Sequence, residues 1–139
     1  MALIVQKYGG TSVGSVERIE AVADRIAKNH ATGDQLIVVV SAMSGETNRL
    51  LGLANDLTPN PSPRELDVLV STGEQVSMAL LSMALHARGI PALSLKGSQV
   101  AIRTDSSHDK ARIRSIDDRR LRSEMAAGKV VVVAGFQGV

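Results

Sequence analysis

Residues 35–40 read QLIVVV and residues 129–134 read KVVVVA, so both stretches are short, apolar and rich in β-branched side chains. Neither shows the alternation of apolar and polar residues that marks a strand with one face in water. Continuous β-branched runs are typical of parallel strands that helices cover on both faces. The two stretches therefore predict a parallel sheet inside an α/β protein.

The segments around the first stretch extend this pattern. Residues 3–8 form another apolar run that ends at glycine and is expected to be a buried strand. Residues 16–30 carry apolar side chains at helical spacing, with Ser15 suited to cap this helix and Gly33 to end it. A further strand is expected at residues 92–95. Strands that alternate with helices in this way favour parallel pairing through helical crossovers.

The middle of the chain is predicted to be helical. Helices are expected at residues 48–57 and 64–70, and a longer helix runs to Ala87 after the STGE segment, residues 71–74. The apolar stripe of the longer helix is expected to be deeply buried. Its members are Val76, Ala79, Leu80, Leu81, Met83, Ala84, Leu85 and Ala87.

Composition argues against several classes of site. The chain has no cysteine and its three histidines lie far apart, so no thiolate or compact histidine metal site is expected. Aromatic residues make up 1% of the chain, too few for a surface that stacks nucleic-acid bases, and the formal net charge is only +2. No run approaches the length of a membrane-spanning helix. We therefore expect a cytoplasmic protein with no nucleic-acid or membrane partner.

Three loops of unusual composition follow predicted strands: residues 9–15, 41–47 and 135–138. In parallel α/β sheets, ligands bind beyond the carboxyl ends of the strands, where such loops lie. The first loop opens a helix, where backbone N–H groups can bind phosphate and Lys7 can add a positive charge. The alternative is a plain strand-to-helix turn. The spacing is not that of a P-loop, because Ser15 stands where the lysine belongs.

The second loop and the STGE segment each allow two interpretations. Hydroxyl groups in residues 41–47 can contact phosphate or carboxylate oxygens, but capping of the next helix by Ser44 or Thr47 is the commoner role. Ser-x-x-Glu is also the capping-box pattern, in which Ser71 caps a helix and Glu74 bonds back to the Ser71 backbone N–H. Glu74 can instead face the ammonium group of a substrate, and one carboxylate cannot easily do both.

Taken together, these segments resemble the aspartate kinases. KYGGTS at residues 7–12 is similar to the Lys-(Phe/Tyr)-Gly-Gly-(Thr/Ser)-Ser signature of that family, and VSAMSGETN at residues 40–48 is similar to its second glycine- and hydroxyl-rich loop. STGE resembles the family's (Ser/Thr)-x-Gly-Glu segment, and AGFQG at residues 134–138 resembles the loop that closes the first half of the domain. The order and spacing match over the whole chain.

The resemblance implies a three-layer α/β/α sandwich with a mainly parallel sheet, the amino acid kinase or carbamate kinase-like fold. Residues 1–139 would be its N-terminal, aspartate-binding part, without the ATP-binding half and the C-terminal ACT domains. Aspartate kinases transfer the γ-phosphoryl group of MgATP to the side-chain carboxylate of L-aspartate, the first step toward lysine, threonine and methionine. The resemblance thus implies ATP, with the Mg²⁺ that it carries, as cofactor, and a parent enzyme that is a homo-oligomer.

The resemblance also implies roles for individual residues. Lys7 would be the catalytic residue, because it would neutralise charge on the transferring phosphoryl group. Thr47 and Glu74 would bind aspartate, Glu74 through the ammonium group. The residues expected to bind ATP are Lys7, Tyr8, Gly9, Gly10 and Ser41.

Because aspartate kinases continue well beyond this length, the chain is expected to be an incomplete fragment with little or no kinase activity alone. One alternative is another amino acid kinase, acting on acetylglutamate, carbamate or a nucleotide. A second is a non-catalytic binding fragment of the same fold. The third is a nucleic-acid binder that uses the arginine-rich residues 103–122, for which steep salt dependence would be the mark.

Overall fold

The computed structural model describes residues 2–96, 102–104, 113–116 and 119–134. Its main sheet has four strands, all parallel, in the order β1 (Leu3–Tyr8), β2 (Gln35–Val40), β6 (Val130–Ala134) and β3 (Ala92–Leu95). The short strands β4 (Ile102–Thr104) and β5 (Ile113–Ile116) pair antiparallel with each other in a second sheet.

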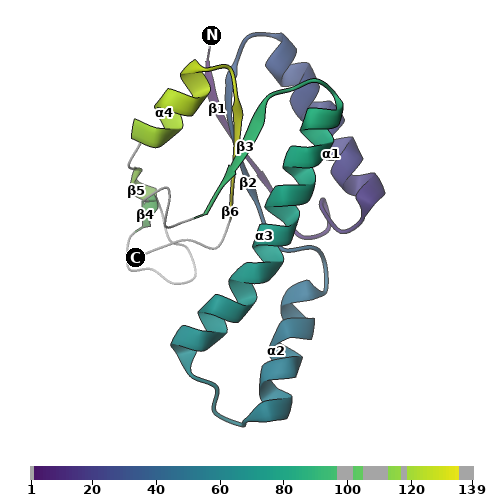
Figure 1. Ribbon diagram of the computed structural model, residues 1–139, viewed down its shortest axis with the longest axis vertical. Coiled ribbons are helices and arrows are strands. Elements are labelled where there is room, and N and C mark those ends of the chain that lie inside the picture. The colour runs from purple at the N-terminus through teal and green to yellow at the C-terminus, as the bar shows by residue number, and fades with distance from the viewer. Residues whose placement is uncertain (1, 97–101, 105–112, 117–118, 135–139) are drawn as a thin grey trace.

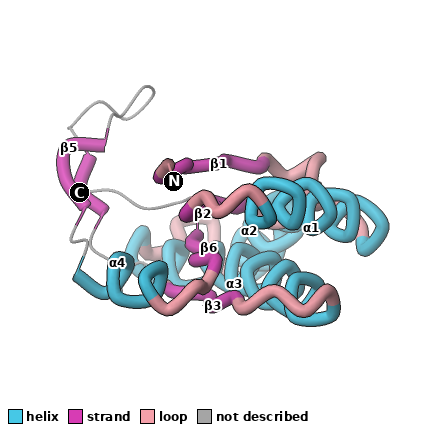
Figure 2. Tube along the Cα trace, turned by 90° about the horizontal axis from the view of Figure 1, so that it is seen from above, coloured by secondary structure: helices cyan, strands magenta, loops and turns pink. Residues whose placement is uncertain are grey.

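Helices cover both faces of the main sheet, as its valine-rich strands predict. Alternate residues of β2 point to opposite sides: Leu36 and Val38 face one layer, while Ile37 and Val39 face the other. The first layer consists of α1 (Val16–Ala31) and α3 (Pro63–Ala87), and the second contains α4 (Arg119–Ala126) (Figure 1). Figure 2 shows these layers on either side of the strands. The predicted three-layer α/β/α sandwich is confirmed.

The ends of α1 agree with the prediction. The Ser15 hydroxyl accepts a hydrogen bond from the Arg18 backbone N–H at 3.2 Å, which satisfies one of the donors that a first helical turn leaves open. The helix ends at Ala31, shortly before Gly33. Ile19 and Ile26 lie on its buried face, against the sheet. Local sequence signals therefore suffice to place this helix.

Strand β1 lies at the edge of the sheet and is only half buried, which corrects the prediction of a buried strand. Ile4 and Tyr8 pack toward the layer that contains α1. Leu3, Val5 and Lys7 alternate with them and are exposed on the other face. Within the described residues, the buried side chains of α4 cluster on that face with residues of β2, β3 and β6.

Helix α3 is one continuous helix of 25 residues, so the predicted break at the STGE segment is wrong. Ser71 does not cap a helix: its hydroxyl donates to the Val68 carbonyl at 2.8 Å, and the Thr72 hydroxyl donates to the Leu69 carbonyl at 2.6 Å. A capping box needs backbone N–H groups that lack a helical acceptor. In the continuous helix α3, the turn that precedes Ser71 already supplies acceptors for these N–H groups, so no capping box forms there.

The predicted stripe of α3 is also wrong in part, because the helix turns a different face to the core. Met83, a predicted core residue, is 61% exposed, and Val76 is exposed as well. The residues that α3 buries are Gly73, Glu74, Ser77, Met78, Leu81, Ser82 and Leu85. The helix is apolar on nearly all sides, so hydrophobic periodicity cannot select the inward face.

By length and composition α3 could cross a membrane, contrary to the expectation that no segment reaches this length. Its setting is that of a core helix, because Met78, Leu81 and Leu85 pack with the sheet and with α1. Its first half lies beside α2 (Glu46–Leu57), and together they project beyond the carboxyl ends of the strands (Figure 1). This projection places α2 and the middle of α3 next to the loops after β1 and β2.

The two faces of α3 predict opposite responses to truncation. We expect Leu81→Ala to lower the free energy of unfolding by about 2–5 kcal/mol, because Leu81 is fully buried and truncation leaves a cavity. The matched variant Met83→Ala should change it by less than about 0.5 kcal/mol. Urea unfolding of both variants measures the difference, and equal losses would contradict the face assignment.

Candidate functional site

The first loop turns the chain sharply where β1 ends. The Ser12 backbone N–H donates to the Gly9 carbonyl at 3.0 Å, and the Gly14 N–H donates to the Thr11 carbonyl at 3.4 Å. These turns lead directly into the N-terminus of α1, capped by Ser15. The loop therefore presents backbone groups beside a helix N-terminus, as expected of an anion-binding turn.

Backbone hydrogen bonds join the second loop to the first. The Ser41 N–H donates to the Tyr8 carbonyl at 3.2 Å, and the Ser44 N–H donates to the Gly10 carbonyl at 3.1 Å. These bonds continue the pairing of β1 with β2 past the ends of the strands. The two loops therefore form one connected structure at this edge of the sheet.

Helix α2 begins directly after the second loop, and its cap differs from the prediction. Gly45 is the N-cap residue, with φ of +82°, and no side chain caps the helix. The predicted capping by Ser44 or Thr47 is therefore wrong. Glycine suits this position because other residues rarely adopt a positive φ. Ser44 and Thr47 instead line a pocket.

This pocket has a volume of about 300 Å³ and lies between the two loops and the middle of α3. Its lining residues are Gly10, Ser41, Ala42, Met43, Ser44, Gly45, Thr47, Asn48 and Glu74. Glu74 supplies the acidic group and is 5% exposed, inside the continuous helix rather than at its end. The fold thus places one acidic residue in the lining of a pocket whose other lining residues are small or polar, apart from Met43.

The chemistry of this lining suits a small ligand that carries both charges. A buried carboxylate can accept hydrogen bonds from an ammonium group. Thr47 and Asn48 lie in the first turn of α2, where backbone N–H groups have no acceptor inside the helix and attract anions. The hydroxyl of Ser41 and the side-chain amide of Asn48 add further donors. An amino acid fits this arrangement.

The structure brings some of the predicted site residues together and leaves others apart. Gly10, Ser41, Thr47 and Glu74 line the pocket. Lys7, Tyr8 and Gly9 are not part of its lining. They precede it along the chain, and their proposed contacts with ATP stay predictions. The third predicted loop, residues 135–138, lies outside the described residues.

Lys7 and Tyr8 point to opposite faces of the sheet because side chains alternate along a strand. Tyr8 is buried in the core, its hydroxyl donates to Gln6 Oε1 at 3.1 Å, and its ring centroid lies 6.0 Å from the Arg25 guanidinium carbon. Lys7 is exposed on the other face. Tyr8 therefore serves packing, while its backbone carbonyl holds the second loop through Ser41.

Some lining residues were not singled out from the sequence. Met43, Ser44 and Asn48 lie in or directly after the loop that was recognised, but nothing in the local pattern separates pocket residues from capping residues. The signal that could have identified Asn48 is its position in the first turn of a helix whose N-terminus meets the pocket. In the described part of the chain, no group of three or more acidic, histidine or cysteine side chains could hold a metal ion.

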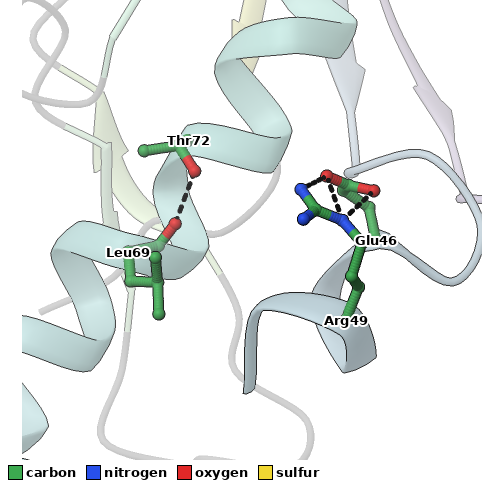
Figure 3. Close-up of polar contacts among 4 residues, drawn as sticks. All are labelled: Glu46, Arg49, Leu69 and Thr72. Carbon is green, nitrogen blue, oxygen red and sulfur yellow. Dashed lines mark hydrogen bonds and ion pairs between the residues drawn. The ribbon is translucent and has the colours of Figure 1, made fainter. Parts of the chain in front are cut away.

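An ion pair on α2 lies beside the pocket. The Arg49 guanidinium donates to both carboxylate oxygens of Glu46, with Nε at 3.1 Å from each (Figure 3). Hydrogen bonding to Arg49 lowers the pKa of the Glu46 carboxyl below its ordinary value. Glu46 therefore stays ionised at neutral pH and is held next to α3.

Comparison with known proteins gives one consistent family. The model for the amino acid kinase family matches residues 2–139. The aspartokinase of Pseudomonas aeruginosa is 68% identical over 139 residues, and the match covers 100% of this chain but 34% of that protein. This chain thus spans about a third of the length of the curated relatives it matches.

Solved structures share the fold. The crystal structure of an aspartate kinase from Synechocystis superposes with a TM-score of 0.80 at 54% identity, covering 98% of this chain and 22% of that one. Escherichia coli aspartokinase III, in complex with aspartate and ADP, gives a TM-score of 0.78 at 23% identity, covering 99% of this chain and 41% of that one. At 23% identity the second match shows the fold alone.

Removal of the Arg49 charge tests the ion pair. We expect Arg49→Met to raise the pKa of Glu46 toward its ordinary value, because the lowering comes mainly from the Arg49 hydrogen bond. Since the folded-state pKa is lowered, the pair stabilises the fold above the unfolded-state pKa. This contribution is lost as pH falls through the folded-state pKa.

Carbon-13 NMR titration of the glutamate carboxyls measures the shift. Arg64→Met is the matched control, because Arg64 pairs with Glu65 at 2.8 Å and does not contact Glu46. An unchanged Glu46 pKa in Arg49→Met would contradict the assigned cause.

Proposed function

The chain belongs to the amino acid kinase family, and on this premise we propose that it supplies the aspartate-binding part of an aspartate kinase. Such an enzyme transfers the γ-phosphoryl group of MgATP to the side-chain carboxylate of L-aspartate. The observation that carries the proposal is the pocket between the two loops and α3, whose lining combines Glu74 with Ser41, Thr47 and Asn48. The 68% identity to an aspartokinase supports this choice among family members.

In the proposed complex, the Glu74 carboxylate accepts hydrogen bonds from the ammonium group of L-aspartate. Thr47 and the first turn of α2 donate to a carboxylate of the same ligand. Glu74 is buried, so its attraction to the ammonium group is screened less by water than on an open surface.

The ATP phosphates are proposed to lie at the glycine-rich first loop. Gly9, Gly10 and Ser41 would contact them, and Lys7 would neutralise charge on the group in transfer. Phosphoryl transfer depends on positioning and charge neutralisation more than on covalent chemistry by the protein. The accepting carboxylate is already ionised at pH 7, so the reaction needs no strong general base. Hydroxyl, backbone and lysine groups are therefore adequate for the proposed chemistry.

The proposal includes several properties of the longer enzyme. Mg²⁺ would arrive with ATP, and the product would enter the synthesis of lysine, threonine and methionine. The enzyme would be a cytoplasmic homo-oligomer whose ATP-binding half and ACT domains are not part of these 139 residues. The isolated chain is accordingly expected to bind L-aspartate but to give little acyl phosphate in a hydroxylamine-trapping assay.

Neutralising Glu74 tests the aspartate site. We expect Glu74→Gln to weaken L-aspartate binding by roughly 10- to 100-fold, because charge-assisted hydrogen bonds contribute about 1.5–3 kcal/mol. Isothermal titration calorimetry on the 139-residue chain measures the change. Glu65→Gln is the matched control, since Glu65 is an exposed carboxylate of the same helix, away from the pocket.

Two outcomes would count against the proposal. Equal loss of affinity in both glutamine variants would mean that charge on α3, and not the pocket carboxylate, attracts the ligand. Binding of acetylglutamate or carbamate in preference to L-aspartate would point to another member of the family.

Phosphoryl transfer itself needs a complete enzyme. A chimera in which this chain replaces the matched 139 residues of the Pseudomonas aeruginosa relative provides one. We expect the chimera to form aspartyl hydroxamate from L-aspartate, MgATP and hydroxylamine, and Lys7→Met to abolish most of that turnover. A chimera that folds and binds L-aspartate but forms no product would argue that this chain has a binding role only.

A further inference from the structure

A glycine lies in the middle of α3, next to the pocket carboxylate. Gly73 is buried and directly precedes Glu74. Glycine in the interior of a helix is less stable than alanine, because it loses more backbone freedom on folding. A specific contact can offset this cost where another segment approaches the helix closely.

Such a contact exists on the side of Gly73 that faces the second loop. A Cβ atom built at position 73 would lie 3.0 Å from the Ala42 Cβ and 3.3 Å from the Glu46 Cγ. The first distance is tighter than nine in ten real Cβ contacts, so a side chain at position 73 would require Ala42 or α3 to shift by a few tenths of an ångström. Ala42 is itself buried and lines the pocket.

The first loop also approaches Ala42 closely. A Cβ atom built at Gly10 would lie 3.0 Å from the Ala42 carbonyl oxygen. The Ser44 N–H also donates to the Gly10 carbonyl, which ties the two loops together. Ala42 therefore lies close to both Gly10 and Gly73, neither of which carries a methyl group.

The second neighbour of Gly73 is restrained as well. Glu46 is ion-paired with Arg49 on α2, as Figure 3 shows, so its side chain is not free to turn away without breaking that pair. On α3, the Thr72 hydroxyl bonds to the Leu69 carbonyl of its own helix and not to the Glu46–Arg49 pair. Close packing at Gly73 is thus one contact that joins α3 to the second loop and to the start of α2.

We propose that Gly73 is a positioning residue, which lets α3 touch Ala42 and thereby sets the distance between the Glu74 carboxylate and the second loop. Gly73 itself need not touch the ligand. Its effect passes through Glu74, because a helix displaced at position 73 carries the next residue with it. This role rests on the proposed function insofar as Glu74 binds the ammonium group of L-aspartate.

The positioning role of Gly73 is tested by moving a methyl group from residue 42 to residue 73. Gly73→Ala adds a methyl group on α3, and the double variant Ala42→Gly/Gly73→Ala removes the methyl group that it meets. Gly52→Ala is the matched control, because Gly52 also lies inside a helix, but a Cβ there meets nothing within 4 Å. Each protein is compared by calorimetry with L-aspartate and by the amide NMR signals of residues 41–48 without ligand.

We expect Gly73→Ala to shift these signals and to weaken L-aspartate binding by about tenfold or more, as overpacking at a contact does. The double variant should recover both the signals and most of the affinity, and Gly52→Ala should change neither. If Gly73→Ala does not fold, recovery of folding and of the signals in the double variant supports the same role. Unchanged signals in Gly73→Ala, or no recovery in the double variant, would overturn it.

The two readouts separate this inference from the proposed function. If the wild-type chain does not bind L-aspartate, the proposed function fails. The shift of the ligand-free signals in Gly73→Ala and their recovery in the double variant still decide whether Gly73 sets the pocket.

Discussion

The parallel pairing of β1 with β2 is the constraint on which the site depends. The two strands end level, since Tyr8 pairs with Val40, and the bond from Ser41 to Tyr8 extends this register into the loops. A shift of one residue would exchange the faces of every side chain in the edge strand. It would also separate the Ser44 N–H from the Gly10 carbonyl. The pocket is thus a consequence of backbone register before any side chain contributes to it.

Side chains add charge and selectivity to this backbone framework. The pocket is lined mainly by small residues, and its acidic group enters from the middle of a helix rather than from a loop. A carboxylate on a packed helix is held more rigidly than one on a loop, because neighbours such as Met78 and Leu81 fix the helix against the sheet. The close contacts at Gly10 and Gly73 then bring the three segments near enough to share one ligand.

Much of the fold follows from local patterns. The valine runs of β2 and β6 and the cap at Ser15 each have a direct physical meaning, and each is found where it was expected. The STGE segment was misinterpreted because the Ser-x-x-Glu pattern can stand either at the start of a helix or inside one. At the start of a helix the pair forms a cap, whereas inside a helix its backbone donors are already bonded.

The order of strands and helices, the burial of β2 and β6 on both faces and the loops that follow β1 and β2 are properties of the sequence, because periodicity and β-branched runs act locally. The inward face of α3 is not a property of the local sequence, since an apolar helix becomes oriented only through packing against α1 and the sheet. The same packing brings Glu74 to Ser41 and Thr47, while strand alternation turns the Lys7 side chain to the opposite sheet face from Tyr8. Such long-range neighbours depend on how whole elements fit together, which no local pattern records.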